Sequence, residues 1–323
     1  MPDIRISKCK NLLVKVFIIG YSVRGESIVV LFLDKEEQNE VLYSIVIDCF
    51  SYKGLNKTDE ILNSFSISNV DMLCWSHPDL DHTKGIDVII NKYCKDTTKI
   101  ILPQGLNGKD YDVINYNKGD IDIVNKIIKL NQRKKKVQLT ASVTPALYQP
   151  MEELGFVDYP DKISVNIHAL SPHSTLINER IGGDKKIEKN ELSTVIFIEI
   201  GNSYKLVFCS DIENYSINNL KKSCFEDAVL VKIPHHTSMT SNNLLPMLRN
   251  GDDNMLGCTT VYTTHELPDP FLLNDYKNIC SQVHTTGTKK GNSINFGIVE
   301  YTFDFYDNQT ATIKCHGHAE LVS

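Results

Sequence analysis

The hydrophobic and polar positions of this chain form short apolar runs, rich in β-branched and aromatic residues, that alternate with polar turns. Two such runs, over 12–19 and 27–33, are joined by the turn-forming linker 20–26, so the pattern predicts a β-hairpin. The tail alternates over 299–314 around Asp307-Asn308 and predicts a second hairpin. The remaining apolar runs predict strands over 41–47, 70–75, 99–103, 164–173, 194–200, 204–209 and 228–233.

Helical spacing of apolar residues appears between several of these strands. It predicts helices over 58–65, from Gly85 to Lys92, and over 121–130. Strands that alternate with helices are typical of an α/β fold. Neither a repeat nor a linker divides the chain, so we expect a single domain over 1–323 with a less typical insert around 104–163.

A dense group of imidazole and carboxylate side chains follows the predicted strand 70–75. His77, Asp79, Asp81 and His82 form the spacing H-x-D-x-D-H on what the pattern predicts to be a loop at a strand end. In an α/β sheet, ligands bind at this end of the strands. Groups packed so closely repel one another unless a cation neutralises them, and this mixture suits Zn²⁺, Mn²⁺ or Fe²⁺.

Other predicted strands also end in residues that bind metals. His173 is the last residue of strand 164–173, Asp211 follows 204–209, and the pair His235 and His236 follows 228–233. If these ends meet at one edge, they supply the six or seven ligands that two cations need, with Asp211 as the natural bridge. Asp48 ends strand 41–47, where it is either a turn residue or a group that orients a ligand histidine.

Composition limits the class of partner. The 323 residues are 41% hydrophobic and 23% charged, and 34 Lys and Arg against 40 Asp and Glu give a formal net charge of −6. This balance excludes a strongly basic nucleic-acid coat but not a local basic patch. One run of four cations is either a solvated helix end or a contact for a phosphate backbone: Arg133, Lys134, Lys135 and Lys136.

The cysteines and the apolar segments indicate the compartment. Nine cysteines occur without a C-x-x-C pair, which favours reduced, buried thiols in a reducing environment. No segment approaches the roughly 20 apolar residues that span a membrane, and the amino terminus lacks the apolar region of a signal peptide. We therefore expect a cytoplasmic protein with no membrane partner, while the oligomeric state stays open.

Several of these motifs together resemble one family of enzymes. The sequence over Ser76–His82 resembles the metal motif of the metallo-β-lactamase-fold hydrolases, with Asp in its third position. Arg24–Ser27 resembles the first Gly-acid-Ser turn, and Lys232–Ser238 resembles Pro-His-His-Gly-Ser with Thr237 in place of glycine. Ser210-Asp211 stands where the family usually has Gly-Asp. Within the family the chain is most similar to the hydrolase domain of the bacterial competence protein ComEC.

The resemblance implies a four-layer αββα sandwich and a centre with two divalent ions, Zn²⁺ or Mn²⁺, with Mg²⁺ as a further alternative. The first ion would be held by His77, Asp79 and, as an open alternative, His173. The second would be held by Asp81, His82 and one of His235 and His236, with Asp211 between the ions. Residues expected to take part in catalysis are Asp81, His235 and His236. The carboxylate of Asp79, in place of an imidazole, makes the first site harder and more anionic, which favours Mn²⁺ or Mg²⁺ there and leaves Zn²⁺ as an alternative.

These patterns favour a metal-dependent hydrolase that acts through metal-activated water. We expect a phosphodiesterase or nuclease whose substrate is a nucleic acid or nucleotide, because the centre is hard and a basic run is present. Two alternatives remain: a hydrolase of a small ester, lactone, amide or thioester, which the overall acidity favours, and a metal-binding sensor module without turnover.

Overall fold

The computed structural model describes residues 4–102, 137–139, 150–158, 161–182, 188–201, 204–248, 254–287, 295–305 and 311–323. Within these residues the strands form two large sheets. Sheet A has the order β1 (Arg5–Lys8), β8 (Glu152–Asp158), β9 (Asp161–Ser171), β10 (Val195–Ile200), β11 (Tyr204–Phe208), β12 (Ala228–Lys232), β13 (Leu256–Thr259), β14 (Gln282–Thr285) and β17 (Glu320–Leu321). Sheet B has the order β16 (Thr312–Gly317), β15 (Phe296–Asp304), β2 (Leu12–Tyr21), β3 (Glu26–Asp34), β4 (Glu40–Ile47), β5 (Met72–Cys74), β6 (Lys99–Leu102) and β7 (Val137–Leu139).

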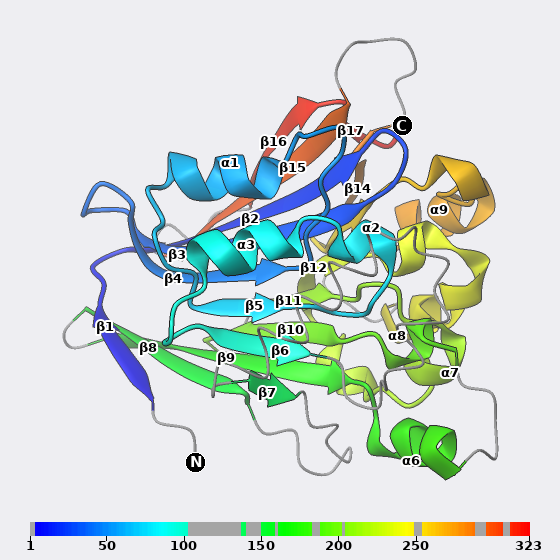
Figure 1. Ribbon diagram of the computed structural model, residues 1–323, viewed down its shortest axis with the longest axis horizontal. Helices are drawn as coiled ribbons and strands as arrows, with labels where there is room; N and C mark the ends of the chain where they lie inside the picture. Colours follow the sequence, from blue (N-terminus) through cyan, green and yellow to red (C-terminus); the bar gives the residue numbers. More distant parts are fainter. Residues whose placement is uncertain are drawn as a thin grey trace.

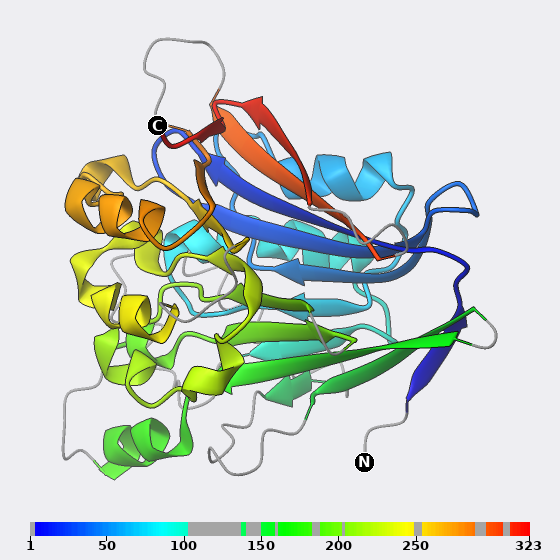
Figure 2. The same cartoon turned by 180° about the vertical axis from the view of Figure 1, so that it is seen from behind.

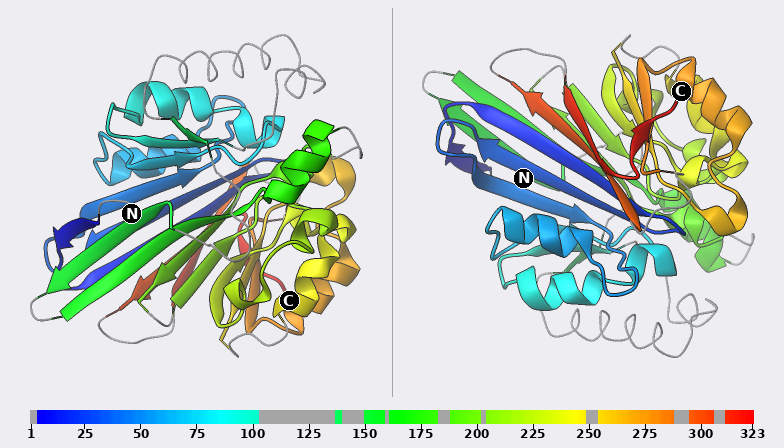
Figure 3. Two further views of the ribbon diagram at one scale, coloured as in Figure 1. Left: turned by 90° about the horizontal axis from the view of Figure 1, so that it is seen from below. Right: turned by 90° about the horizontal axis from the view of Figure 1, so that it is seen from above.

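Helices cover the outer face of each sheet (Figure 3). Helices α1 (Lys57–Ser64) and α3 (Ile86–Tyr93) pack on sheet B through a core that includes Leu62 and Ile90. Helices α7 (Asn214–Ile217), α8 (Leu245–Leu248) and α9 (Pro270–Lys277) pack on sheet A through another core. The layers therefore follow the order helix, sheet, sheet, helix, and the predicted four-layer αββα sandwich is confirmed.

The alternation of apolar residues along β2 explains why two sheets pack together. Val14, Val16 and Ile18 point into the core between the sheets, whereas Phe17 and Ile19 point into the core beneath α1 and α3. A strand that is apolar on both faces needs cover on both sides. Each side chain buried in this way contributes about 1.5–3 kcal/mol relative to exposure.

The parallel strands of the two sheets bring their carboxyl ends to a common region. In sheet B, β4 pairs in parallel with β5 and β5 with β6; in sheet A, β11 to β14 pair in parallel. The short helix α2 (Leu80–Thr83) lies at the end of β5, on the side of the molecule that carries α7 and α8 (Figure 1). The residues that follow these strands therefore meet at one edge.

Most predicted elements are confirmed within a residue or two of their bounds. Both hairpins form, with Thr302 opposite Thr312 in the second. One prediction is wrong: the H-x-D-x-D-H segment does not stay a loop but forms α2 over its last residues. The predicted helix over 121–130 lies outside the described residues.

The sequence analysis did not predict five strands of sheet A, namely β1, β8, β13, β14 and β17, or strand β7 of sheet B. Strand β8 falls in the predicted insert, and it pairs in parallel with β1 and antiparallel with β9. The view from behind shows β1 beside β8, away from the helices α7 to α9 (Figure 2). A parallel partner from the amino terminus, about 150 positions away in the chain, leaves no local pattern to detect.

Two further observations concern cysteines and membranes. Eight of the nine cysteines are buried and Cys315 is exposed, and no disulfide joins cysteines among the described residues. None of the helices described here is both long enough and apolar enough to cross a membrane.

Candidate metal centre

The strand ends of sheet B carry half of the centre. Ile47 and Cys74 are register partners on the parallel strands β4 and β5, so Asp48 and the segment Trp75–His77 leave the sheet side by side. Beyond them the chain turns through α2, where His82 N donates to Asp79 O at 3.0 Å and Cys49 N donates to His82 O at 3.1 Å. This turn of helix holds Asp81 and His82 against the end of β4.

The strand ends of sheet A carry the other half. After β11, Ser210 takes a left-handed conformation with φ of 47° and is followed by Asp211. After β12, three consecutive residues are left-handed: His235, His236 and Thr237, with φ of 48°, 51° and 63°. His235 N donates to Ser210 O at 2.9 Å, which joins the two turns.

Hydrogen bonds between the segments around Ser76 and the strand ends of sheet A connect the halves. Thr194 N, just before β10, donates to Ser76 O at 3.0 Å. The hydroxyl of Ser210 donates to the hydroxyl of Ser76 at 2.6 Å, and both side chains are buried. The centre therefore lies where the carboxyl ends of both sheets meet.

Four buried side chains form a compact group of donor atoms, which we call the four-donor group: Asp81, His82, Asp211 and His236. Asp211 Oδ2 is 3.4 Å from His82 Nε2 and 3.5 Å from His236 Nε2. Asp81 Oδ2 is 3.3 Å from His236 Nε2 and 3.9 Å from His82 Nε2. Ligand atoms about 2.0–2.1 Å from a tetrahedral ion are about 3.3–3.4 Å apart, so this spacing fits one divalent ion.

The histidines are oriented by the other ring nitrogen. His82 Nδ1 is 2.8 Å from Asp48 Oδ2, and His236 Nδ1 is 2.7 Å from Thr260 Oγ1. His77 Nδ1 is 3.0 Å from Ser76 Oγ. The Nε2 atoms of all three rings are buried and make no hydrogen bond. This is the arrangement of histidines that ligate a metal, in which the remote nitrogen is fixed by a hydrogen bond.

Asp48 lies behind the centre as an orienting group. It accepts hydrogen bonds from Ser76 N at 2.7 Å and Ser76 Oγ at 2.5 Å besides its contact with His82. Asp48, His77 and His82 also form a closely spaced set of possible ligands. The Ser76 hydroxyl, which contacts both Asp48 and His77, fills the space between them, so this set is a hydrogen-bonded network.

The electrostatics of the four-donor group favour a cation. Burial would lower the pKa of His236, but Asp211 and Asp81 raise it to about 9. Burial would raise the pKa of Asp211, but His82 and His236 hold it well below the usual range. The carboxylates thus stay ionised and draw positive charge into the pocket. The buried donors without hydrogen bonds and their chemistry fit a divalent metal ion.

His236 is connected to a buried ion pair through Thr260, a residue that sequence reasoning did not assign to the centre. Thr260 Oγ1, which contacts His236, donates to Glu26 Oε2 at 2.8 Å. Glu26 forms an ion pair with Lys232, and the two side chains are 1% and 0% exposed. Thr260 could have been found, because it directly follows the parallel strand β13, whose carboxyl end reaches the same edge.

The other members of the predicted site lie around the four-donor group. His77 Nε2 is 3.7 Å from Asp79 Oδ2 and 3.9 Å from Asp211 Oδ2. Asp79 Oδ1 forms an ion pair with Lys189, whose side chain is 32% exposed. Burial would raise the pKa of Asp79, but His77 and Lys189 lower it. The Asp79 side of the centre therefore already holds a positive charge.

His235 and His173 lie outside the four-donor group. His235 is partly exposed; its Nδ1 is 3.1 Å from Glu213 Oε1 and 2.9 Å from Thr240 Oγ1. His173 is buried, accepts a hydrogen bond from Thr175 N at 3.3 Å, and belongs to neither set of closely spaced donors among the described residues. The predicted nucleic-acid contact, Arg133 to Lys136, falls outside the described residues.

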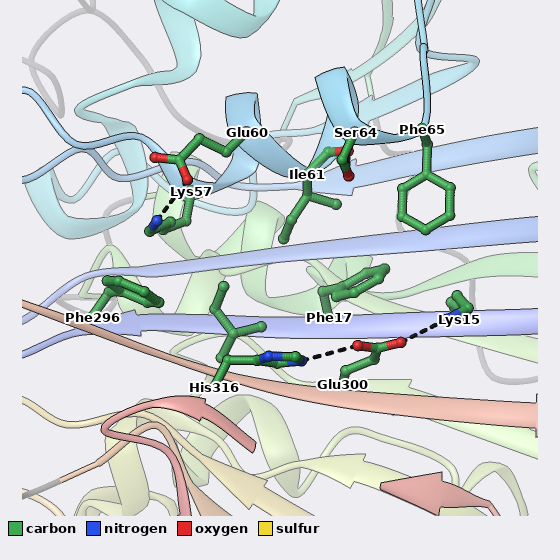
Figure 4. A pocket seen from close by; sticks show the side chains of 11 residues that line it. Lys15, Phe17, Lys57, Glu60, Ile61, Ser64, Phe65, Phe296, Glu300 and His316 are labelled. Carbon is green, nitrogen blue, oxygen red and sulfur yellow. Dashed lines mark hydrogen bonds and ion pairs between the residues drawn. The ribbon is translucent and has the colours of Figure 1, made fainter. Parts of the chain in front are cut away.

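A separate pocket of about 480 Å³ lies between α1 and the strands β2, β15 and β16 (Figure 4). Its lining includes the rings of Phe17, Phe65 and Phe296. Its charged side chains are occupied with one another: Lys57 pairs with Glu60, and Glu300 contacts both Lys15 and His316. No residue of the four-donor group lines this pocket.

Comparisons with known proteins give a likeness of fold only. No family model matches the chain, and no curated protein matches it. Among solved structures, the chain is similar to the metallo-β-lactamase fold protein YhfI from Bacillus subtilis, with 13% identity, a TM-score of 0.41, and coverage of 90% of this chain and 99% of that one. It is also similar to a diphosphatase from the PhnP family, with 11% identity, a TM-score of 0.36, and coverage of 80% and 93%. Likeness at this level says nothing about the substrate or the metal of this chain.

Proposed function

We propose that this protein is a divalent-metal-dependent hydrolase and that its substrate is a phosphodiester, such as a nucleic acid or a nucleotide. The observation that carries the proposal is the four-donor group. Its two histidines are fixed through Nδ1, their Nε2 atoms make no hydrogen bonds, and both face ionised carboxylates. Such a pocket is built to hold a cation that activates water rather than to position a protein nucleophile.

A divalent ion in this group would supply Lewis acidity toward water and toward a substrate oxygen. The side chains do the rest. Asp48 and Thr260 hold the imidazoles of His82 and His236 in place. Burial of Asp81 and Asp211 excludes bulk water from the donor atoms, which strengthens their electrostatic interaction with bound charge.

His235 is placed to move a proton at the rim of the centre. Its Nδ1 faces the carboxylate of Glu213, so the neutral ring carries its proton on Nδ1 and leaves Nε2 as the acceptor. Asn190 Nδ2 is 3.5 Å from His235 Nε2. His235 therefore suits the protonation of a leaving oxygen.

Two features favour a phosphodiester over a neutral ester. Carboxylate oxygens in the donor set suit the hard ions that accompany phosphoryl chemistry. In addition, Arg24 is connected to the centre through Tyr262. Arg24 Nη1 donates to Tyr262 Oη at 3.3 Å, and the Tyr262 ring packs edge-on against His236 at 5.3 Å between centroids. A guanidinium at this position would attract an anionic substrate.

The test is hydrolysis of single- and double-stranded DNA, RNA and cyclic nucleotides with Mn²⁺ or Zn²⁺, next to a panel of chromogenic carboxylic esters. We expect activity on a phosphodiester that a chelator abolishes and that His82→Ala and His236→Ala remove. His316→Ala, which alters a histidine of the separate pocket, serves as the control. Activity on the esters alone, or bound metal with no activity on any phosphodiester, would overturn the proposal.

A further inference from the structure

An ammonium group occupies the Asp79 side of the centre. Lys189 forms an ion pair with Asp79 Oδ1, and Asp79 Oδ2 faces His77 Nε2 at 3.7 Å. His77 and Asp79 are the residues that the motif assigns to the first of two metal ions. The Asp79 carboxylate, which the motif assigns to that ion, is thus already neutralised by the Lys189 ammonium.

The backbone holds Lys189 in this place. Lys189 directly precedes the short 3-10 helix Asn190–Leu192, and Leu192 N donates to Lys189 O at 2.9 Å. The same segment leads to Thr194, whose N–H donates a hydrogen bond to the carbonyl oxygen of Ser76. Ser76 directly precedes His77. The lysine and the motif are therefore fixed relative to each other by main-chain hydrogen bonds.

The donor atoms divide unequally between the two halves. The four-donor group offers four atoms at the spacing of one coordination sphere. On the other side, His77 Nε2 is 3.7 Å from Asp79 Oδ2 and 3.9 Å from Asp211 Oδ2, but Asp79 joins neither closely spaced set among the described residues. A second divalent ion would also lie against an ammonium group at the same carboxylate, where like charges repel.

We propose that the Lys189 ammonium stands in place of the second metal ion, so that the centre binds one divalent ion, in the four-donor group. This rests on the proposed function and differs from the two ions that the sequence predicts. Asp211 Oδ1 is buried and makes no hydrogen bond. Together with His77 and Asp79 it forms a latent second site, which becomes available when the charge of Lys189 is removed.

The experiment measures metal content rather than turnover. The full chain is stripped with a chelator, loaded with Zn²⁺ or with Mn²⁺, freed of excess ion, and analysed by mass spectrometry for metal per chain. We expect one ion per chain in the wild type and two in Lys189→Met, which keeps an unbranched side chain one atom shorter and removes the charge. Lys189→Arg keeps the charge and should stay at one. Asp79→Asn should also stay at one, because Asp79 is not a ligand of the resident ion.

A matched lysine controls for a general loss of charge. Lys92 pairs with Asp59 at 2.7 Å, and the side chains are 46% and 26% exposed, similar to the pair of Lys189 and Asp79. Lys92→Met should bind one ion. Two ions in the wild type, one ion in Lys189→Met, or fewer than one in Asp79→Asn would each overturn the inference while leaving the proposed hydrolase intact. A wild type that binds no metal would overturn both.

Discussion

Neutralising Glu26 tests whether the buried ion pair behind His236 is a structural support of the centre. Glu26→Gln keeps the shape of the side chain and an acceptor for Thr260, but it leaves the Lys232 ammonium, at 0% exposure, without its paired carboxylate. Breaking a buried pair by removing one partner costs about 3–5 kcal/mol. With an unfolding entropy of about 2.1 cal/mol/K per residue, 323 residues give about 0.7 kcal/mol/K, so the melting temperature should fall by about 4–7 °C.

The assay is urea and thermal unfolding of the chelator-treated protein, so that bound metal does not contribute to stability. Lys232→Met should destabilise by a similar amount, because it leaves Glu26 as the unpaired charge. The double variant Glu26→Gln with Lys232→Met removes both charges and should cost less than the sum of the single changes by about 0.5–3 kcal/mol. A loss below about 1 kcal/mol for Glu26→Gln, or strictly additive losses, would refute the reasoning.

Three further predictions concern residues around the centre. Thr260→Val removes the hydroxyl that fixes His236 and should weaken metal binding by about 10–100-fold. The fluorescence of the single tryptophan measures metal binding, and Thr260→Ser should bind the metal normally. His236→Ala should lose the metal, whereas His235→Gln should retain it and lose activity; metal loss in His235→Gln would contradict the placement of the pair. Thr237→Val should unfold more easily than Thr237→Gly by about 1–3 kcal/mol, because both lose the hydroxyl but only glycine relieves the left-handed backbone; equal stabilities would refute this.

The sequence predicts the fold and the region of the site because both depend on local patterns. The apolar runs over residues 12–19 and 27–33 define a β-hairpin that is apolar on both faces. A hairpin of this kind requires a packed layer on each side of its sheet. The rule that parallel strands end at a common edge brings Asp48, Asp211 and His236 to one place. The number of ions stays open at this level, because spacing along the chain does not show which charges meet in space.

The parts that sequence reasoning missed depend on backbone conformation and on distant partners. The choice between His235 and His236 is made by three successive left-handed residues, which turn one ring inward and the other toward Glu213. Lys189 meets Asp79 from 110 positions along the chain. Neither feature leaves a periodic signal, so only the folded arrangement reveals that one acid of the motif is already neutralised.

Two departures from the motifs that this sequence resembles share one physical explanation. Ser210 stands at the glycine of the Gly-Asp motif and Thr237 at the glycine of Pro-His-His-Gly-Ser, and both are left-handed, with φ of 47° and 63°. A left-handed residue other than glycine costs about 1–3 kcal/mol. Each hydroxyl makes a buried hydrogen bond that glycine would lack, Ser210 to Ser76 at 2.6 Å and Thr237 to Thr259 at 2.7 Å, and such a bond contributes about 0.5–1.5 kcal/mol. The cost of the left-handed backbone and the gain from the hydrogen bond nearly cancel in the free energy of unfolding. The hydrogen bonds nevertheless tie the turns carrying Asp211 and His236 to neighbouring strand ends. The centre thus has less backbone freedom and better-fixed donor atoms than a glycine at either position would give.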